Sequence, residues 1–188
     1  ARSIAVVKAA ADRFGWQPRV SGKPAGQGDI LTGRGFAHAL RSQTVVATAV
    51  EVEVNRRTGR VWVKRIVCAQ DCGLVINPLS LTQTLQANVA QTWSRTMKEE
   101  VRFDRRRVTS VDWITYPVAR MSDMPPQIDI VIVNRPEVPS TGAGEAGSRA
   151  LAAAVGNAIF DAVGVRLRQV PLTPAKVKAA LAEAGGKA

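Results

Sequence analysis

The chain has 188 residues, of which 46% are hydrophobic and 22% charged, and its mean hydropathy is −0.02. This composition is typical of a folded globular chain and excludes an intrinsically disordered one, and no apolar run reaches the ~20 residues of a membrane span. A net charge of +11 suggests nucleic-acid binding, but the basic residues are scattered and no aromatic RNA-binding motif is present. We therefore expect no nucleic-acid partner, and favour solvated loops or a surface that docks on an acidic partner.

The N-terminal half is predicted to hold a helix, a linker and a hairpin. Ser3 can cap a helix with one apolar face and Gly15 can end it; that face is Ile4, Val7, Ala11 and Phe14. Residues 16–35 are rich in Gly, Pro and polar residues, which indicates a linker or surface loop. Alternating valines then predict a strand over 46–54, a turn over 55–59 and a return strand over 61–67.

The C-terminal half is predicted to mix helices with short strands. Asn77 and Pro78 favour a helix start, and apolar residues four apart predict its buried stripe: Leu81, Leu85, Val89, Trp93 and Met97. There follow a hairpin over 101–103 and 108–113, a strand over 128–132, a helix from Ser148 to near Gly164, a strand over 165–170 and a helix over 173–186. This order indicates an α+β fold with a mixed, largely antiparallel sheet and helices packed on one face.

The residues divide into a helix and linker over 1–32 and a main domain over 33–188. Cysteine and histidine side chains are few, since the chain has only Cys68, Cys72 and His38. A structural zinc site takes four Cys or His ligands and an iron–sulfur cluster usually four thiolates. We therefore assign no metal ligand to this chain, and interpret the cysteines as two separate, half-buried thiols.

Residues 142–147 form the one loop whose pattern indicates chemistry. They read Gly-Ala-Gly-Glu-Ala-Gly, formally a dinucleotide fingerprint, but residues 134–141 separate them from the preceding strand. Asp161 lies inside a predicted helix rather than at a strand end, and Arg149 after Ser148 excludes a P-loop. Glu145 remains, between glycines that allow a bulky ligand to approach. From the pattern it is either a general base or an ordinary acid near a helix start.

Several segments carry a family resemblance: GRGFAHAL (33–40), VCAQDCGLVINP (67–78), TMKEEV (96–101), VDWITYPVARMSDMPP (111–126) and the STGAGEAG segment with the helix after it (139–170). Together they resemble the C-terminal part of the molybdenum-binding subunit of the xanthine dehydrogenase/aldehyde oxidase family, of the isoquinoline 1-oxidoreductase β-subunit type. The resemblance implies a molybdenum–pterin cofactor of the molybdopterin cytosine dinucleotide type. It implies that Glu145 is the base beside the molybdenum, and that Gly142, Ala143 and Gly144 contact the cofactor.

The helix after Asn77 departs from the family pattern. Where family members show Gln-x-Glu-Gly, with the glutamine holding the pterin, this chain has Thr84, Gln86 and Ala87 at the three specified positions. Gln83 and Gln86 are the side chains expected to take over that contact. A divergent or inactive paralogue is the alternative.

The resemblance also implies a reaction and partners. The reaction is hydroxylation of an N-heteroaromatic compound, or oxidation of an aldehyde, with water as the oxygen source. Family subunits are several times longer, so this chain is expected to be a C-terminal piece that folds alone but holds no cofactor and is inactive. Its partners would be the remainder of the molybdenum subunit and an iron–sulfur subunit or other electron-transfer protein. The rival interpretation is a non-catalytic binding or assembly domain with a basic docking surface.

Overall fold

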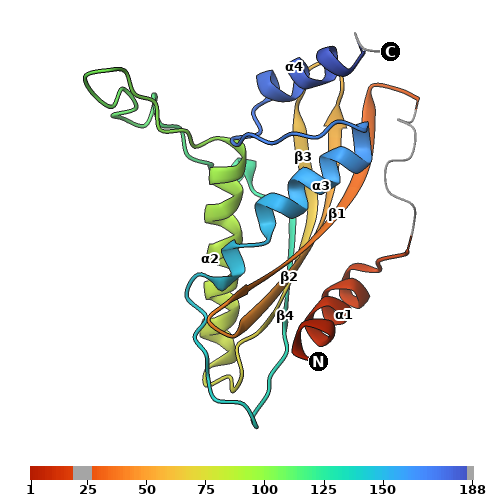
Figure 1. Ribbon diagram of the computed structural model, residues 1–188, viewed down its shortest axis with the longest axis vertical. Helices are drawn as coiled ribbons and strands as arrows, with labels where there is room; N and C mark the ends of the chain where they lie inside the picture. Colours follow the sequence, from red (N-terminus) through yellow and green to blue (C-terminus); the bar gives the residue numbers. More distant parts are fainter. Residues whose placement is uncertain (19–26, 186–188) are drawn as a thin grey trace.

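The computed structural model describes residues 1–18 and 27–185, in which helices and strands alternate irregularly (Figure 1). The elements, in chain order, are α1 (Arg2–Phe14), β1 (Ile30–Arg41), β2 (Thr44–Asn55), β3 (Val61–Asp71), α2 (Pro78–Met97), β4 (Gln127–Ile132), α3 (Leu151–Val163) and α4 (Pro174–Gly185). Two short 3-10 turns lie at Met121–Asp123 and Ala146–Ser148. Among the helices described, none is long and apolar enough to cross a membrane.

The four strands form one mixed sheet in the order β1-β2-β3-β4. The first three strands are antiparallel, whereas β4 pairs in parallel with β3. Ser42 and Gln43 connect β1 to β2 with φ angles of 44° and 70°, the left-handed conformation that matches the twist of a two-residue hairpin. The predicted α+β class and largely antiparallel sheet are confirmed.

The two faces of the sheet carry separate cores, because side chains alternate along β2. Val46 and Val50 face the cluster that contains residues of α2, α3 and α4, including Leu85 and Ile159. Val45, Ala47 and Ala49 face the opposite cluster, which contains Val6, Ala10 and Phe14 of α1. Figure 1 shows α1 and α2 on opposite sides of the strands. The expectation that all helices pack on one face is therefore wrong for α1.

Strand β1 owes its glycines to close contact with α3. A Cβ at Gly33 would collide with the Ala158 carbonyl of α3, and one at Gly35 with the Ala154 carbonyl. Asp161 on α3 also accepts a hydrogen bond at 2.8 Å from the Arg34 N–H on the outer edge of β1. The loop predicted over 16–35 is wrong from Ile30 onward, and its residues 19–26 lie outside the described residues. The proposed boundary at 32/33 lies within β1 and stays a prediction.

The helix caps were predicted with mixed success. Asn77 caps α2 by accepting a hydrogen bond from the Ser80 N–H at 3.0 Å, and all five residues of the predicted stripe are buried. Ser3 does not cap α1, which starts one residue earlier, and its buried face is Val6, Ala10 and Phe14. Ser148 does not open α3, which starts at Leu151, because its hydroxyl is used in a contact with α2.

Residues 101–118, called the arm below, leave the body of the molecule after α2. Figure 1 shows this segment extending sideways from the end of the helix. The hairpin predicted here is wrong, since a single bridge between Phe103 and Val108 forms in place of two strands. The strand predicted over 165–170 is also wrong, and the chain there is irregular. In both segments the apolar alternation exists, but among the described residues neither segment pairs with a neighbouring strand.

Candidate functional site

Two polar side chains from distant segments, one on β2 and one on α2, hold the loop of residues 142–147 in place. Thr44, the first residue of β2, donates to the Gly142 carbonyl at 2.7 Å. Asn88 of α2 donates to the Gly144 carbonyl at 3.0 Å and accepts from the Ser148 hydroxyl at 3.0 Å. Both supporting side chains are buried, so the loop is fixed to the sheet and to α2.

The outer part of the loop is open and its inner part is packed. Gly142 has a φ of +85°, and no heavy atom lies within 4 Å of the place where a Cβ would stand at Gly142 or Gly144. A Cβ at Gly147, by contrast, would crowd Leu85 and Asn88 on α2. A large ligand can therefore approach the backbone over 142–144, while 146–147 anchor the loop.

Glu145 stands on the open side, with its side chain 76% exposed. Its Oε2 lies 3.4 Å from Nη2 of Arg41, which ends β1. A hollow of about 500 Å³ opens on one side of it, and its lining is Thr84, Ala87, Asn88, Gln91, Arg95, Gly144, Glu145, Ser148 and Arg149. A second of about 340 Å³ opens on the other side, and its lining is Arg41, Ser42, Thr44 and residues 141–146. Among these described lining residues, Glu145 is the one carboxylate.

Helix α2 turns Thr84 toward the loop, and Gln83 and Gln86 elsewhere. Thr84 lines the larger hollow and also a third one of about 270 Å³ beside Ala143 and Gly144. Gln83 and Gln86 are exposed and line none of the three. The structure thus brings Gly142, Ala143, Gly144 and Glu145 together with the Thr84 face of α2, and leaves the two glutamines outside the group.

Asp71 fixes the segment that leads into the loop. Its buried carboxylate accepts hydrogen bonds from Arg2 at 2.6 Å, from Arg135 at 2.7 Å and from the Gly73 N–H at 2.9 Å. Burial by itself would raise the pKa of Asp71, but these hydrogen bonds outweigh it and lower the pKa to about 2. The Thr141 N–H also donates to the Cys72 carbonyl at 2.8 Å, so the loop starts from a fixed point beside β3.

The cysteines are both free, as predicted, but are fully rather than half buried. Burial raises the pKa of Cys68 to about 12, which leaves its thiol protonated and unreactive at neutral pH. Within residues 1–18 and 27–185, no group of three or more His, Cys, Asp or Glu side chains is placed to hold a metal ion.

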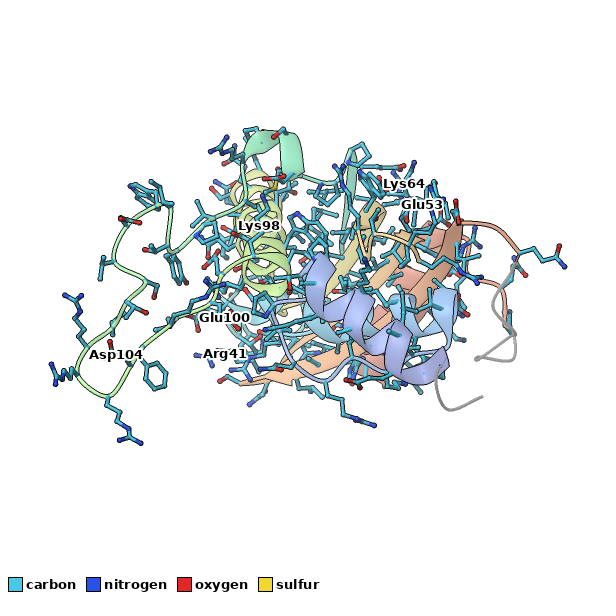
Figure 2. All side chains as sticks on the ribbon, turned by 90° about the horizontal axis from the view of Figure 1, so that it is seen from above. Arg41, Glu53, Lys64, Lys98, Glu100 and Asp104 are labelled. Atoms are coloured by element: carbon cyan, nitrogen blue, oxygen red, sulfur yellow. The ribbon has the colours of Figure 1, made fainter. Side chains whose placement is uncertain are left out.

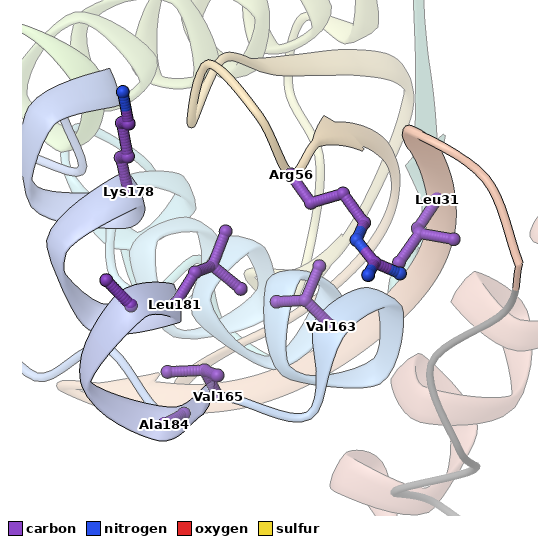
Figure 3. Close-up of a pocket in the computed structure, with 8 residues that line it drawn as sticks. Leu31, Arg56, Val163, Val165, Lys178, Leu181 and Ala184 are labelled. Carbon is purple, nitrogen blue, oxygen red and sulfur yellow. The ribbon is translucent and has the colours of Figure 1, made fainter. Parts of the chain in front are cut away.

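Another hollow lies at the opposite end of β1 and is separate from the loop. It has a volume of about 470 Å³ and is mainly apolar, with Leu31, Val163 and Leu181 in its wall and Arg56 and Lys178 at its edge (Figure 3). Its lining, as far as the structure describes it, contains no carboxylate. The candidate chemistry therefore stays with the Glu145 loop.

The loop over 142–147 stands out in the sequence, but the residues that support it do not. Arg41, Thr44 and Asn88 come from β1, β2 and α2, and nothing in the local patterns of Arg41 and Thr44 marks them. The one available signal was Asn88, an amide placed between the apolar stripe residues Leu85 and Val89.

Comparisons with known proteins identify the family of the chain. The family model described as the molybdopterin cofactor-binding domain matches residues 9–125. The chain is 39% identical over 193 residues to a nicotinate dehydrogenase subunit of Pseudomonas putida, covering 98% of this chain and 16% of that protein. It is 30% identical over 174 residues to the β-subunit of isoquinoline 1-oxidoreductase of Brevundimonas diminuta, covering 93% of this chain and 21% of that protein.

A solved structure gives the same result. Quinoline 2-oxidoreductase from Pseudomonas putida 86 superposes with a TM-score of 0.69 at 28% identity, over 74% of this chain and 19% of that one. The chain thus spans about a sixth to a fifth of the length of these relatives. The resemblance seen in the sequence is confirmed: the chain belongs to the xanthine dehydrogenase/aldehyde oxidase family, and corresponds to part of its molybdenum-binding, molybdopterin-binding subunit.

Proposed function

We propose that this chain is one part of a molybdenum hydroxylase subunit and that Glu145 is its general base. The proposed substrates are N-heteroaromatic compounds or aldehydes, with water as the oxygen source. The observation that carries the proposal is the open carboxylate of Glu145, mounted on a firmly anchored glycine loop between two hollows. The names of the relatives support it, since they include a nicotinate dehydrogenase, an isoquinoline 1-oxidoreductase and an aldehyde oxidoreductase of Escherichia coli.

The residues present fit a molybdenum–pterin cofactor. The free space beside Gly142 and Gly144 suits a bulky ring system, and Ala143 lies between them. Arg95 and Arg149, which line the larger hollow, suit the phosphates of a molybdopterin cytosine dinucleotide. Of the α2 side chains, Thr84 is placed to contact the group directly. Gln83 and Gln86 would contact it only where it extends over the outer side of the helix.

The bound cofactor would supply the two-electron redox chemistry, and this chain would supply a base. Glu145 would accept, at a carboxylate oxygen, the proton released by the oxygen nucleophile that attacks the substrate carbon. Arg41, 3.4 Å from Oε2, orients that carboxylate. Thr44 and Asn88 keep the loop backbone in place, so that the carboxylate is held at a constant position during the reaction.

Completion of the site would require the remainder of the molybdenum subunit, and electrons would leave through an iron–sulfur subunit or another electron-transfer protein. The test is Glu145→Gln in the assembled enzyme. Glutamine keeps the volume but cannot accept the proton, so turnover should fall roughly 10²- to 10⁴-fold while molybdenum and pterin contents stay the same. Stability should hardly change, because the side chain is exposed.

Glu137→Gln is the matched control, since Glu137 is also an exposed glutamate on the segment before α3, with its side chain 65% exposed. It should keep full turnover. Near-normal turnover of Glu145→Gln at matched molybdenum content would refute the catalytic assignment. Absence of molybdenum and pterin from the assembled wild-type complex would instead favour the non-catalytic assembly domain.

A further inference from the structure

The arm exposes an unusual amount of apolar surface. None of residues 101–118 is buried, and the exposed fraction is 76% for Phe103, 79% for Trp113 and 88% for Ile114. The other large apolar residues exposed on the arm are Val101, Val108, Val111 and Val118. Single exposed apolar side chains are ordinary on a protein surface, but a run of them on one segment marks an interaction site.

The arm is shaped by its own turns rather than by a core. Asp104 accepts hydrogen bonds from the Arg106 and Arg107 N–H groups at 2.7 and 3.0 Å, which closes the outer turn. Asp112 accepts from the Thr115 N–H at 2.8 Å, which closes a second turn beside Trp113. Such Asx turns define a backbone conformation without burying apolar side chains. The arm can therefore present its apolar residues in a defined arrangement.

The base of the arm is fixed to the body. Tyr116 donates to Glu99 at 2.8 Å, and the Ala119 N–H donates to the Ser94 hydroxyl of α2 at 2.8 Å. Lys176 of α4 bonds to Glu100 at 2.7 Å. Figure 2 shows Asp104 far from the body, and Lys98 and Glu100 close to it. The direction in which the arm projects is thus set by contacts at its root.

The composition of the arm suits a protein partner. Tryptophan, phenylalanine and arginine are enriched at protein interfaces, and the arm carries Phe103 and Trp113 together with Arg102 and the arginines at 105–107. A buried aromatic side chain contributes roughly 150–250 Å². The two aromatics alone would supply about 300–500 Å² of the roughly 800 Å² that one partner contributes to a standard interface.

The comparisons with known proteins point to the protein partner that would cover the arm. The matched family model runs over residues 9–125 and so includes the arm, and the match to the nicotinate dehydrogenase relative takes in 98% of the chain. The arm is therefore part of the domain rather than an insertion beside it. Yet the same match covers only 16% of that relative, so most of the larger polypeptide lies outside this domain and is available to cover the arm.

We propose that the arm is the surface by which this domain docks on the remainder of the larger molybdenum-binding polypeptide, with Trp113 and Ile114 at the centre of the contact. This proposal rests on the proposed function only in taking the chain to be one part of such a polypeptide. It requires neither a bound cofactor nor the role given to Glu145.

The test compares amide hydrogen exchange over residues 101–118 in two proteins. One is the 188-residue chain, and the other is the full-length nicotinate dehydrogenase relative from Pseudomonas putida carrying this chain in place of its matched segment. Exchange should be fast in the chain alone and at least tenfold slower in the full-length protein. Trp113→Ser/Ile114→Ser should restore fast exchange there. The control Ile4→Ser/Ile30→Ser, which changes two exposed apolar residues of the body, should not.

Equal exchange in the two proteins overturns the proposal. If the hybrid does not fold, the aligned segment is measured in the unaltered relative, where fast exchange overturns it equally. Slow exchange in the chain alone, with the mass of a dimer, would assign the arm to a second copy. Binding of the chain to anionic phospholipid vesicles, without protection in the hybrid, would assign it to a membrane surface. Protection of the arm with unaffected turnover of Glu145→Gln would retain this inference and reject the proposed function.

Discussion

Asp71 allows a quantitative test of the ion pairs that fix the segment leading into the candidate loop. Its carboxylate joins Arg2 of α1, Arg135 after β4 and the Gly73 turn after β3. The lowering of its pKa from 3.8 to about 2 corresponds to about 2 kcal/mol of stabilisation of the folded state. Because the folded-state pKa is the lower one, this stabilisation is complete above about pH 5 and is lost as the pH falls through 2.

Asp71→Asn should therefore lower the free energy of unfolding at pH 7 by at least about 2 kcal/mol, since it removes the charge and leaves Arg2 and Arg135 facing a neutral amide. Urea unfolding at pH 7 and pH 3 measures the gap, which is the difference in the free energy of unfolding between wild type and Asp71→Asn. With pKa values of 3.8 unfolded and about 2 folded, the gap should narrow by about 1 kcal/mol between those pH values.

The control for Asp71→Asn is Glu137→Gln. Glu137 pairs with the same Arg135 at 3.5 Å but is exposed, so its loss should leave the free energy of unfolding close to that of the wild type at both pH values. A gap between wild type and Asp71→Asn that is the same at pH 7 and pH 3 would refute the ionic account. The loss would then have to be assigned to packing.

Two further substitutions test the fold and the site. Gly35→Val should lower the free energy of unfolding in urea by more than about 3 kcal/mol, because its Cβ meets the α3 backbone. Gly156→Ala, in open space on α3, should instead raise the free energy of unfolding by about 0.5–1 kcal/mol. Equal effects of the two substitutions would contradict the close contact between β1 and α3. Asn88→Ala removes the hydrogen bond to the Gly144 carbonyl and should cost about 1–3 kcal/mol, with faster amide exchange confined to residues 142–148, and unchanged exchange there would mean that Asn88 does not hold the loop.

The elements that sequence predicted best are those with two independent local signals. The pair β2 and β3 has alternating valines on both sides of a turn with Asn55 and Gly59, and α2 has both a capping residue and an apolar stripe. Strand β1 was missed because it carries Gly33 and Gly35, which read as loop residues. They are glycine because the backbone of α3 lies directly against them, a contact that no local pattern reveals.

The wrong hairpin over 101–113 has a different cause. Apolar alternation shows that one side of a segment avoids water, but it does not say whether the cover is a strand of the same sheet or another part of a larger protein. The site shows the same limit. Glu145 could be proposed because its loop is continuous in sequence, whereas Arg41, Thr44 and Asn88 are brought to it by three separate elements.

The parallel pairing of β3 with β4 has a consequence for the order of assembly during folding. Strands β1 to β3 are joined by short turns and pair through local contacts, whereas β4 joins β3 only after the chain has returned from Asp71 to Gln127 through α2 and the arm. Closing so long a loop costs more entropy and is slower than forming a hairpin. The Glu145 loop follows β4 and binds to Thr44 and Asn88, so it can reach its final conformation only when β1 to β3, α2 and β4 are in place. We therefore expect the part of the molecule assigned to chemistry to form last, so that a chain arrested before β4 pairs with β3 would lack the candidate site.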